Sequence, residues 1–467
     1  MQKIFFVSGS GEKFEEMKVI FDLEELEIVW YQKSINELQT DDAEQLIKKK
    51  ALEAFKEIRR PVLVEHTALS IEAFNKLPGL QTDYFYSCLG CKKIVDFCKT
   101  EEDFVASVKS IFCFCDGKNF YIAEDEECGR ITNELDEEEA FAWDKIFIPE
   151  ENNEDQLTYS KLKTLKNEVS MRKKAWVKLK NKYKNQILTL NRNIDDTEDI
   201  KRLAKLIKDG KVLLFLGAGI SASLKFGSWS DLIGDLGRKI GYDPELFQIY
   251  GDYMMLAEYA ELQLKSSLYQ YIKEKFSITN RLDIQEKLKN SKIYRNIMKL
   301  NFPLIYTTNY DHLIEEYLDF GKHKYNKVTN IEDIKEADPR ELRIVKFHGD
   351  IEDEKMIVLS ESQYFKRMDF QSFLDVMLQA DMLQYHVLFL GYSMSDINIK
   401  LLLYLARKRW ENRERPMQAY IFTATPNEIQ KEVFKKNNII SFSGEQTDKE
   451  KSTLAFLERL CSYYENS

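Results

Sequence analysis

A chain of 467 residues is longer than one hydrophobic core usually supports, so two or three domains are expected. The composition, with 44% hydrophobic and 31% charged residues, 18 Gly and 8 Pro, excludes a mainly disordered or low-complexity protein. The net charge of −10 argues against a nucleic-acid partner, because binding to a phosphate backbone depends on Lys and Arg.

Apolar runs and cysteines together predict the cellular compartment. No stretch approaches the roughly 20 apolar residues that span a bilayer, and residues 1–7 are too short in their apolar part for a signal peptide. The 7 Cys are an odd number scattered along the chain, which is typical of reduced thiols. We therefore expect a cytoplasmic protein without a membrane segment.

The first predicted elements include a turn that suits phosphate binding. An apolar strand at residues 2–7 runs into Ser8-Gly9-Ser10-Gly11-Glu12-Lys13, a glycine-bearing turn that leads into a helix. Lys13 stands where it can reach a phosphate group. A second buried strand, residues 61–67, delivers Glu65 and His66 toward its end.

Aromatic and charged residues follow further along the chain. Phe141, Trp143 and Asp144 are close in sequence, and Lys166 and Arg172 come later. Aromatic planes together with Asp, Lys and Arg suit a purine base, on which they stack and with which they form hydrogen bonds. The alternative is a set of core aromatics beside a surface salt bridge.

The first domain is predicted to close with an amphipathic helix that has a Lys-rich outer face. Apolar residues recur there at three- and four-residue spacing: Val169, Trp176, Leu179, Tyr183 and Ile187. A polar, helix-poor stretch follows at residues 191–197. We therefore expect a first domain at 1–190 and a second domain at 197–467.

The second domain alternates short apolar strands with helical patterns. The predicted strands are residues 212–216, 304–306, 344–347, 387–390 and 419–423. This alternation predicts a mostly parallel sheet with helices on both faces. The fold class is therefore α/β throughout, and the second domain is expected to be Rossmann-like with helical insertions.

Four polar clusters stand at the ends of these strands. They are Gly217-Ala218-Gly219-Ile220-Ser221, Tyr306-Thr307-Thr308-Asn309-Tyr310-Asp311, His348-Gly349-Asp350 and Gly391-Tyr392-Ser393-Met394-Ser395-Asp396. Glycines at a strand-to-helix turn let the backbone approach a pyrophosphate. Because the carboxyl ends of parallel strands line one crevice, we expect the four clusters to converge on one ligand.

In that order the four clusters resemble the sirtuin-like superfamily, specifically its bacterial NAD-consuming antiphage branch. The resemblance covers roughly residues 197–467 and implies NAD as the substrate. It implies that Asn309, Asp311 and His348 are catalytic, with the first two at the nicotinamide ribose. The residues that it assigns to binding NAD are Gly217, Ala218, Gly219, Ser221, Thr308, Gly391, Ser393 and Asp396.

Two departures separate this chain from protein-deacylating sirtuins. No cysteine lies between Cys128 and Cys461, so the four-cysteine zinc module is missing and no zinc is expected. Residues 222–229 also lack the G-I-P-D-F-R loop of the deacylases. Cleavage of NAD to ADP-ribose and nicotinamide is therefore favoured, with Asn309 orienting water or ribose and His348 accepting a proton. A structural role for His348 is the alternative.

The first domain resembles the inosine triphosphate pyrophosphatase family over about residues 1–190. The motifs are S-G-S-G-E-K at the first turn, F-A-W-D at Phe141–Asp144, and S-M-R at Ser170–Arg172. The resemblance implies a two-lobed mixed sheet. It assigns nucleotide binding to Ser8, Ser10, Lys13, Glu37, Lys50, Glu65, His66, Phe141, Trp143, Asp144, Lys166, Ser170 and Arg172.

This domain departs from the family at its catalytic strand. Members carry two acidic residues where this chain has Glu65-His66, and Met171 replaces a histidine of the base-reading motif. Magnesium prefers oxygen ligands, so Glu37 and Glu65 are expected to hold it only weakly. The domain is therefore expected to bind a nucleotide and to hydrolyse it poorly.

The pairing resembles the Kongming type of antiphage system, in which a pyrophosphatase-like and a sirtuin-like subunit act together. This implies that inosine or deoxyinosine triphosphate (ITP or dITP) switches on NAD depletion and abortive infection, and regulated enzymes of this kind are expected to be homo-oligomers. Two alternatives remain. One is a bifunctional pyrophosphatase fused to an NAD-dependent deacylase, and the other is a non-enzymatic NAD-binding sensor.

Overall fold

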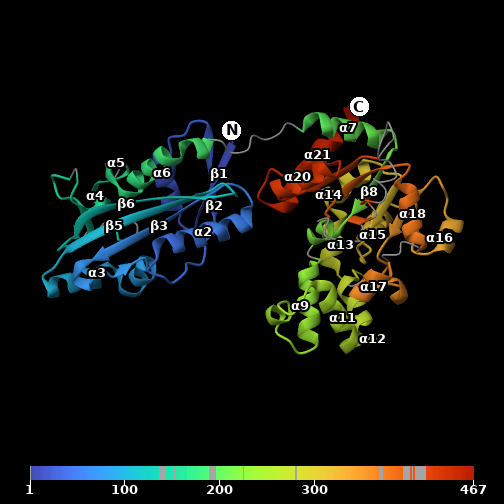
Figure 1. Ribbon diagram of the computed structural model, residues 1–467, viewed down its shortest axis with the longest axis horizontal. Helices are drawn as coiled ribbons and strands as arrows, with labels where there is room; N and C mark the ends of the chain where they lie inside the picture. Colours follow the sequence, from blue (N-terminus) through green and yellow to red (C-terminus); the bar gives the residue numbers. More distant parts are fainter. Residues whose placement is uncertain are drawn as a thin grey trace. The chain divides into compact units, whose positions relative to one another are not determined.

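A computed structural model describes residues 2–135, 143–151, 153–162, 165–188, 196–224, 226–278, 281–367, 372–392, 400–401, 403–404 and 417–466. The chain divides into two compact units, Met1–Ile194 and Asp195–Ser467 (Figure 1). Among the helices in these ranges, none combines the length and the apolar character needed to cross a bilayer.

The N-terminal unit is built on a mixed sheet. Its strands are β1 (Gln2–Ser8), β2 (Leu26–Gln32), β3 (Val62–Ile71), β4 (Pro78–Gly79), β5 (Val105–Cys115), β6 (Phe120–Ile131) and β7 (Phe147–Pro149). They follow the order β2-β1-β3-β5-β6-β7, and β4 pairs with β3. The β2-β1-β3 part is parallel, whereas β3, β5, β6 and β7 pair antiparallel.

Helices cover both faces of this sheet. They are α1 (Gly11–Ile20), α2 (Ala43–Ile58), α3 (Thr82–Glu101), α4 (Tyr159–Leu162), α5 (Lys166–Val169) and α6 (Met171–Leu188), with a 3-10 turn at Glu72–Phe74. Val62 and Val64 of β3 share a core with α2, whereas Leu63 shares a core with Trp176 of α6. Alternate side chains of a strand point to opposite faces, so residues 62–64 of β3 are all apolar because both faces are covered there. The helix expected at the end of this domain is α6, in which Trp176, Leu179 and Ile187 are buried, but Val169 belongs to the separate α5, which ends at an extended Ser170.

The C-terminal unit has a parallel sheet. Its strands are β8 (Val212–Leu216), β9 (Leu304–Thr307), β10 (Tyr325–Val328), β11 (Leu342–Lys346), β12 (His386–Leu390), β13 (Ala419–Thr423) and β14 (Ile439–Ser443). The order is β10-β11-β9-β8-β12-β13-β14, and every one of these pairs is parallel. Five of these strands confirm the predicted ones.

Helices flank this sheet on both sides. They are α7 (Thr197–Lys208), α8 (Ala218–Ala222), α9 (Trp229–Lys239), α10 (Pro244–Phe247), α11 (Tyr253–Leu264), α12 (Ser266–Phe276), α13 (Leu282–Lys289), α14 (Lys292–Lys299), α15 (Leu313–Phe320), α16 (Ile331–Glu336), α17 (Glu361–Lys366), α18 (Phe373–Asp381), α20 (Glu428–Lys436) and α21 (Lys449–Asn466), with a 3-10 turn at Glu354–Met356. In β8, Leu214 and Leu216 face one core, and Leu213 and Phe215 face the other. The α/β class is confirmed, with a mixed sheet followed by a Rossmann-like sheet and a helical insertion, α8–α14, between β8 and β9.

The strand order places a crevice at the end of β8. This strand lies between β9 and β12, so the chain crosses to one side of β8 to form β9 and later to its other side to form β12. Ligands of open α/β sheets bind at such a switch point, outside the carboxyl ends of the strands. Here that position is occupied by the glycine turn that begins at Gly217.

Candidate functional sites

In the C-terminal unit, the glycine turn after β8 packs directly on the end of β12. The Gly219 amide donates to the Gly391 carbonyl oxygen at 2.8 Å, and the Gly217 amide donates to the Leu390 carbonyl at 3.0 Å. A Cβ on Gly217 would lie 2.4 Å from the Gly391 oxygen. Glycine is required at this turn because two backbones meet there. The first and fourth predicted clusters are therefore brought together.

The same turn contacts the cluster after β9. Ser221 Oγ donates to Asp311 Oδ2 at 2.8 Å and accepts from Asn309 Nδ2 at 3.0 Å. Ser221 and Asp311 are buried, whereas Thr308 and Asn309 are half-buried. Burial raises the pKa of the Asp311 carboxyl, although the charge of Lys346 and the Ser221 hydrogen bond oppose this. Ser221 thus links the glycine turn to two residues predicted to be catalytic.

His348 follows β11, the strand next to β9. The Phe347 amide donates to the Thr307 carbonyl at 2.8 Å, so His348 stands just beyond the point where the two strands part. Its side chain is buried, with Nδ1 3.5 Å from the Tyr364 hydroxyl of α17 and the two rings edge to face at 5.3 Å. Arg367 lies over the Phe347 ring and donates to the Phe347 carbonyl. Tyr364 and Arg367, near the C-terminal end of α17, therefore pack around the segment that carries His348.

Two predicted NAD contacts of the fourth cluster, Ser393 and Asp396, lie outside the described residues. Ala218 and Gly219 are exposed, which leaves the turn open to a ligand. Tyr364 and Arg367 were missed by sequence reasoning, because nothing in residues 361–367 marks them as neighbours of His348.

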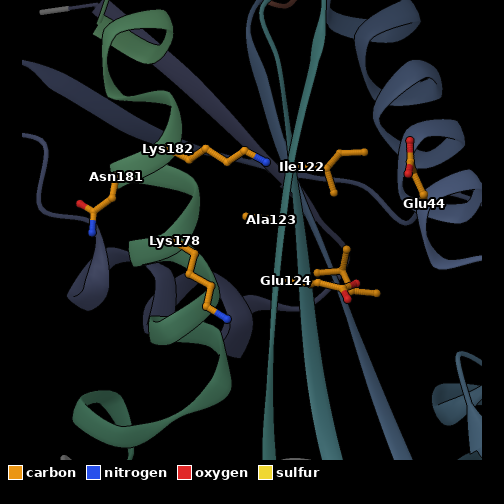
Figure 2. Close-up of a pocket in the computed structure, with 8 residues that line it drawn as sticks. Glu44, Ile122, Ala123, Glu124, Lys178, Asn181 and Lys182 are labelled. Atoms are coloured by element: carbon orange, nitrogen blue, oxygen red, sulfur yellow. The ribbon is translucent and has the colours of Figure 1, made fainter.

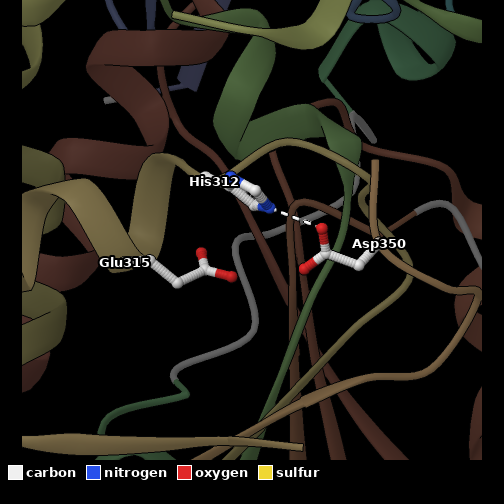
Figure 3. A group of neighbouring side chains, drawn as sticks. All are labelled: His312, Glu315 and Asp350. Atoms are coloured by element: carbon white, nitrogen blue, oxygen red, sulfur yellow. Dashed lines mark hydrogen bonds and ion pairs between the residues drawn. The ribbon is translucent and has the colours of Figure 1, made fainter. Parts of the chain in front are cut away.

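One group of side chains in the described part of the chain has the spacing of metal ligands, and Figure 3 shows it: His312, Glu315 and Asp350. His312 Nε2 lies 2.6 Å from Asp350 Oδ1, and Glu315 completes the group. Lys327 Nζ lies 3.0 Å from Asp350, and the buried Lys346 Nζ lies 3.3 Å from Glu315. These ammonium groups already neutralise the two carboxylates, so the group is an ion-pair network.

In the N-terminal unit, the predicted phosphate-binding lysines are paired with carboxylates. Lys13 Nζ lies 3.1 Å from Glu65 Oε2, and Lys50 Nζ lies 2.6 Å from Glu37 Oε1. Lys50 also donates to the Glu65 carbonyl at 3.0 Å, and His66 Nδ1 lies 3.2 Å from Glu37 Oε1. The structure therefore brings these five predicted residues into one cluster.

The donor set of this cluster does not fit Mg²⁺ as arranged. Burial by itself would raise the pKa of Glu37, but the His66 hydrogen bond and the Lys50 charge outweigh it and hold that pKa well below its usual range. The fully buried Glu65 also has a lowered pKa, because the Lys13 charge and a hydrogen bond from Thr67 outweigh its burial. Both carboxylates are thus satisfied by donors of the protein, and His66 adds a nitrogen where magnesium favours oxygen.

A second set of charged residues surrounds the predicted base-reading cations. Lys166 Nζ lies 2.5 Å from Asp144 Oδ2 and 2.6 Å from Glu16 Oε1, and Arg172 pairs with Glu16 and, at 3.3 Å, with Glu65. Burial raises the pKa of Asp144, against the opposing charge of Lys166. Glu16 of α1 was missed by sequence reasoning, although its place one helical turn after Lys13 is the signal that would find it.

The remaining predicted nucleotide residues have structural contacts. Ser10 caps α1 by accepting from the Lys13 amide at 3.2 Å, and the Ser10 amide donates to Ser8 Oγ at 3.1 Å. Ser170 is buried. Trp143 is buried against Phe147 and Tyr159 at ring distances of 6.0 and 6.3 Å, which corresponds to the core alternative. Phe141 lies outside the described residues.

The N-terminal unit also has an open hollow that is lined by other residues than those predicted to bind nucleotide. Figure 2 shows Lys178, Asn181 and Lys182 on α6 at one side of β6, and Glu44 of α2 at the other side. Ile111, Ile122, Ala123 and Glu124 complete its lining. The residues predicted to bind nucleotide do not line it, so it offers a second place to test for nucleotide binding.

Comparison with known proteins gives one match in the N-terminal unit and a different match in the C-terminal unit. The Ham1 family matches residues 4–182, and a SIR2-like domain matches residues 303–442. The chain is 30% identical over 183 residues to an inosine triphosphate pyrophosphatase of Kluyveromyces lactis, covering 38% of this chain and 94% of the relative. It is 32% identical over 187 residues to a dITP/XTP pyrophosphatase of Methanopyrus kandleri, covering 40% and 98%.

A third relative matches about half of the chain. The NAD(+) hydrolase ThsA of Enterococcus faecium is 30% identical over 248 residues, which are 52% of this chain. The chain spans 48% of the length of that relative. It belongs to the Ham1 family through its N-terminal unit, and residues 303–442 of its C-terminal unit are similar to a SIR2-like domain.

Proposed function

We propose that the C-terminal unit hydrolyses NAD⁺ to ADP-ribose and nicotinamide. The observation that carries the proposal is the contact of Ser221 with both Asn309 and Asp311 at the switch point of the parallel sheet. The glycine turn beside it suits the pyrophosphate of a dinucleotide. The name of the enterococcal relative, NAD(+) hydrolase ThsA, agrees with this choice of substrate.

The residues of the crevice suit the chemistry of this cleavage. Breaking the bond between ribose and nicotinamide builds positive charge on the ribose, as in glycoside hydrolysis. The Asn309 amide orients the attacking water or a ribose hydroxyl, and the Ser221–Asp311 hydrogen bond holds that part of the site in place. His348 accepts the proton that the water loses, because imidazole is the side chain that most often serves as a general base.

We propose that the N-terminal unit binds a non-standard purine triphosphate such as ITP or dITP. Lys13, Lys50, Lys166 and Arg172 supply the positive charges, and phosphate oxygens would take over contacts that carboxylates of the protein now make. Hydrolysis is weak, because the carboxylates that would hold Mg²⁺ are bound by Lys50, His66 and other donors. The names of the two Ham1-family relatives, an inosine triphosphate pyrophosphatase and a dITP/XTP pyrophosphatase, agree with this class of ligand.

We propose that nucleotide binding by the N-terminal unit and NAD⁺ hydrolysis by the C-terminal unit act together in one cytoplasmic homo-oligomer. Nucleotide binding at the N-terminal unit switches on NAD⁺ cleavage, and the loss of NAD⁺ stops phage growth by abortive infection. A constantly active NAD⁺ hydrolase would harm its host, so a fused nucleotide-binding unit serves as the gate.

One assay tests this function. Full-length protein is incubated with NAD⁺ and Mg²⁺, with or without ITP, dITP, XTP or ATP, and nicotinamide release and nucleotide hydrolysis are followed together by chromatography. We expect ITP or dITP, but not ATP, to start nicotinamide release while remaining largely intact. Asn309→Ala should abolish the release and leave nucleotide binding unchanged.

The alternatives give different results in that assay. Rapid release of pyrophosphate from ITP, together with nicotinamide release that requires an acyl-lysine peptide and matches its deacylation, would identify the bifunctional enzyme. Intact NAD⁺ after long incubation with every nucleotide would identify a binding protein instead of an enzyme.

A further inference from the structure

An exposed apolar surface lies on the helical insertion of the C-terminal unit. Its side chains come from α10, the turn after it and α11, and we call them the α10–α11 face: Leu246, Ile249, Tyr250, Met255, Tyr259 and Leu262. The exposed fractions of Leu246, Ile249, Tyr250 and Leu262 are 57%, 77%, 68% and 64%. Residues 242–262 precede the part of the chain that matches the SIR2-like domain.

The members of the α10–α11 face lie on one continuous surface. Met255, Tyr259 and Leu262 are four and three residues apart along α11, so they share one side of that helix. The ring of Tyr242 lies 6.2 Å from both the Tyr259 and Tyr250 rings and joins α11 to the preceding turn. Leu256, Ala257 and Ala260, on the other side of α11, are buried.

The area of this face suits a protein–protein contact. A large side chain offers roughly 150–250 Å² when fully exposed, so six of them at these fractions present several hundred Å². This is the order of the about 800 Å² per partner that a standard interface buries. Contiguous apolar patches of several hundred Å² are at the upper end of what monomeric proteins expose, and patches of this kind are often functional.

The charged residues around the α10–α11 face leave burial of apolar side chains as the main contribution to the free energy of binding a partner. Between Lys239 and Lys265 the sequence has five acidic residues and no Lys or Arg. Four of the five are hydrogen-bonded within the chain: Asp243 and Asp252 cap α10 and α11, Glu258 accepts from Ser362, and Glu261 accepts from Gln363. These carboxylates are already held in place by contacts within the chain, so the exposed apolar side chains supply most of the area that a partner can bury.

We propose that a second copy of this chain docks on the α10–α11 face, so that two such faces pack against each other in a symmetric dimer. This surface gives the proposed homo-oligomer a physical site, and the inference rests on that proposal. The hydrogen bonds of Glu258 and Glu261 tie α11 to α17, which carries Tyr364 beside His348. A partner on this face therefore contacts a helix that is linked to the proposed catalytic histidine.

Sedimentation velocity of the full-length protein tests the surface without NAD⁺ or nucleotide, so the outcome is independent of catalysis. Ile249→Glu places a charge at the face, and Ile429→Glu is the matched control, because Ile429 on α20 is 82% exposed against 77% for Ile249. We expect the wild type and Ile429→Glu to dimerise at micromolar concentration. Ile249→Glu should weaken the dimer at least roughly tenfold, as expected for a residue near the centre of an interface.

Leu262→Glu provides a second variant on α11, and circular dichroism melts verify that every variant folds. Strong association at high salt for the wild type also supports an apolar contact. A wild type that stays monomeric at all concentrations overturns both the surface and the oligomer. Dimers that are equally stable in Ile249→Glu, Leu262→Glu and Ile429→Glu overturn the surface and leave the oligomer in place.

Discussion

At the scale of single residues, the N-terminal site is neutralised by its own carboxylates. Glu37 and Glu65 pair with lysines, and Glu16 bridges Lys166 and Arg172. Binding a triphosphate therefore means exchanging carboxylates for phosphates around the same cations, and nucleotide affinity depends on how easily Glu16 and Glu37 give up their partners. His66 is the residue expected to weaken hydrolysis of the nucleotide most while leaving nucleotide binding intact.

His66→Asp tests that role. An aspartate beside Glu37 forms an oxygen pair that suits Mg²⁺, so we expect Mg²⁺-dependent release of pyrophosphate from ITP to rise at least roughly tenfold above wild type. Two carboxylates at this distance repel each other without the metal. We therefore also expect His66→Asp to melt at a lower temperature than wild type, and added Mg²⁺ to restore the melting temperature.

His66→Asn is the control for this change, because it removes the imidazole without adding a charge. It should respond to Mg²⁺ no more than wild type does. If pyrophosphate release and melting temperature are independent of Mg²⁺ in His66→Asp as well, Glu37 and residue 66 do not form the metal site.

At the scale of elements, the end of β12 and the turn after β8 depend on each other. Gly391 has φ of +67°, and a Cβ there would lie 2.7 Å from the Ile220 amide nitrogen. Gly210 has nearly the same φ, +66°, but a Cβ on it meets nothing within 4 Å. The two glycines thus differ in their surroundings and not in their backbone conformation.

Gly391→Ala and Gly210→Ala separate backbone strain from a steric clash. Left-handed backbone costs an alanine roughly 1–2 kcal/mol in either position. We expect Gly391→Ala to lose about 1–3 kcal/mol more of unfolding free energy, because the methyl group pushes the glycine turn away from β12. Urea unfolding measures both values, and equal losses would mean that the turn moves freely at Gly391.

The start of β12 carries a half-buried titratable group, His386. Burial, together with the charge of Arg202, lowers the pKa of His386, whose Nδ1 accepts from the Gln418 amide at 3.0 Å. Above about pH 6.5 the imidazole is neutral in both the folded and the unfolded chain. Below that pH the unfolded chain takes up a proton that the folded chain resists, so acidification favours unfolding until the folded pKa is reached.

His386→Gln keeps an acceptor for the Gln418 amide and removes the titration. Between pH 7.5 and 5.5 we expect the melting temperature of wild type to fall further than that of His386→Gln, since only wild type gains this proton on unfolding. Differential scanning calorimetry at both pH values gives the comparison. Parallel losses in the two proteins would show that His386 does not contribute to acid sensitivity.

At the scale of the whole molecule, the central expectation is that nucleotide binding in one unit controls NAD⁺ cleavage in the other. Lys166→Met removes a cation that contacts Asp144 and Glu16, whereas Lys178→Met removes a cation from the hollow of Figure 2. A charge-assisted contact contributes about 1.5–3 kcal/mol. The ITP concentration for half-maximal nicotinamide release should therefore rise at least roughly tenfold in Lys166→Met and stay unchanged in Lys178→Met.

Lys166→Arg keeps the positive charge beside the buried Asp144 and should keep most of the response. Thermal melts of the three variants separate loss of fold from loss of nucleotide binding. A response lost in Lys178→Met and kept in Lys166→Met would place the nucleotide in the hollow between α2 and α6 and would contradict the assigned site.

By itself, the sequence determined the order of elements, the class of each sheet and the strand ends at which polar clusters stand. Hydrophobic periodicity and glycine turns act over a few residues, which is why β8, β9, β11, β12 and β13 could be predicted. Contacts between distant segments depend on packing, which is decided by the whole fold. Only the tertiary structure therefore paired Ser221 with Asp311 and Asn309 and placed Glu16 against Lys166 and Arg172.

The α10–α11 face depends on the tertiary structure for the same reason. Its apolar residues resemble any helical core pattern in the sequence, and a pattern of spacing does not tell which apolar side of a helix finds a partner. The structure buries Leu256, Ala257 and Ala260 and leaves Tyr259 and Leu262 exposed on the other side of α11. Burial is a property of the packed molecule, because it depends on what the rest of the chain places beside each residue.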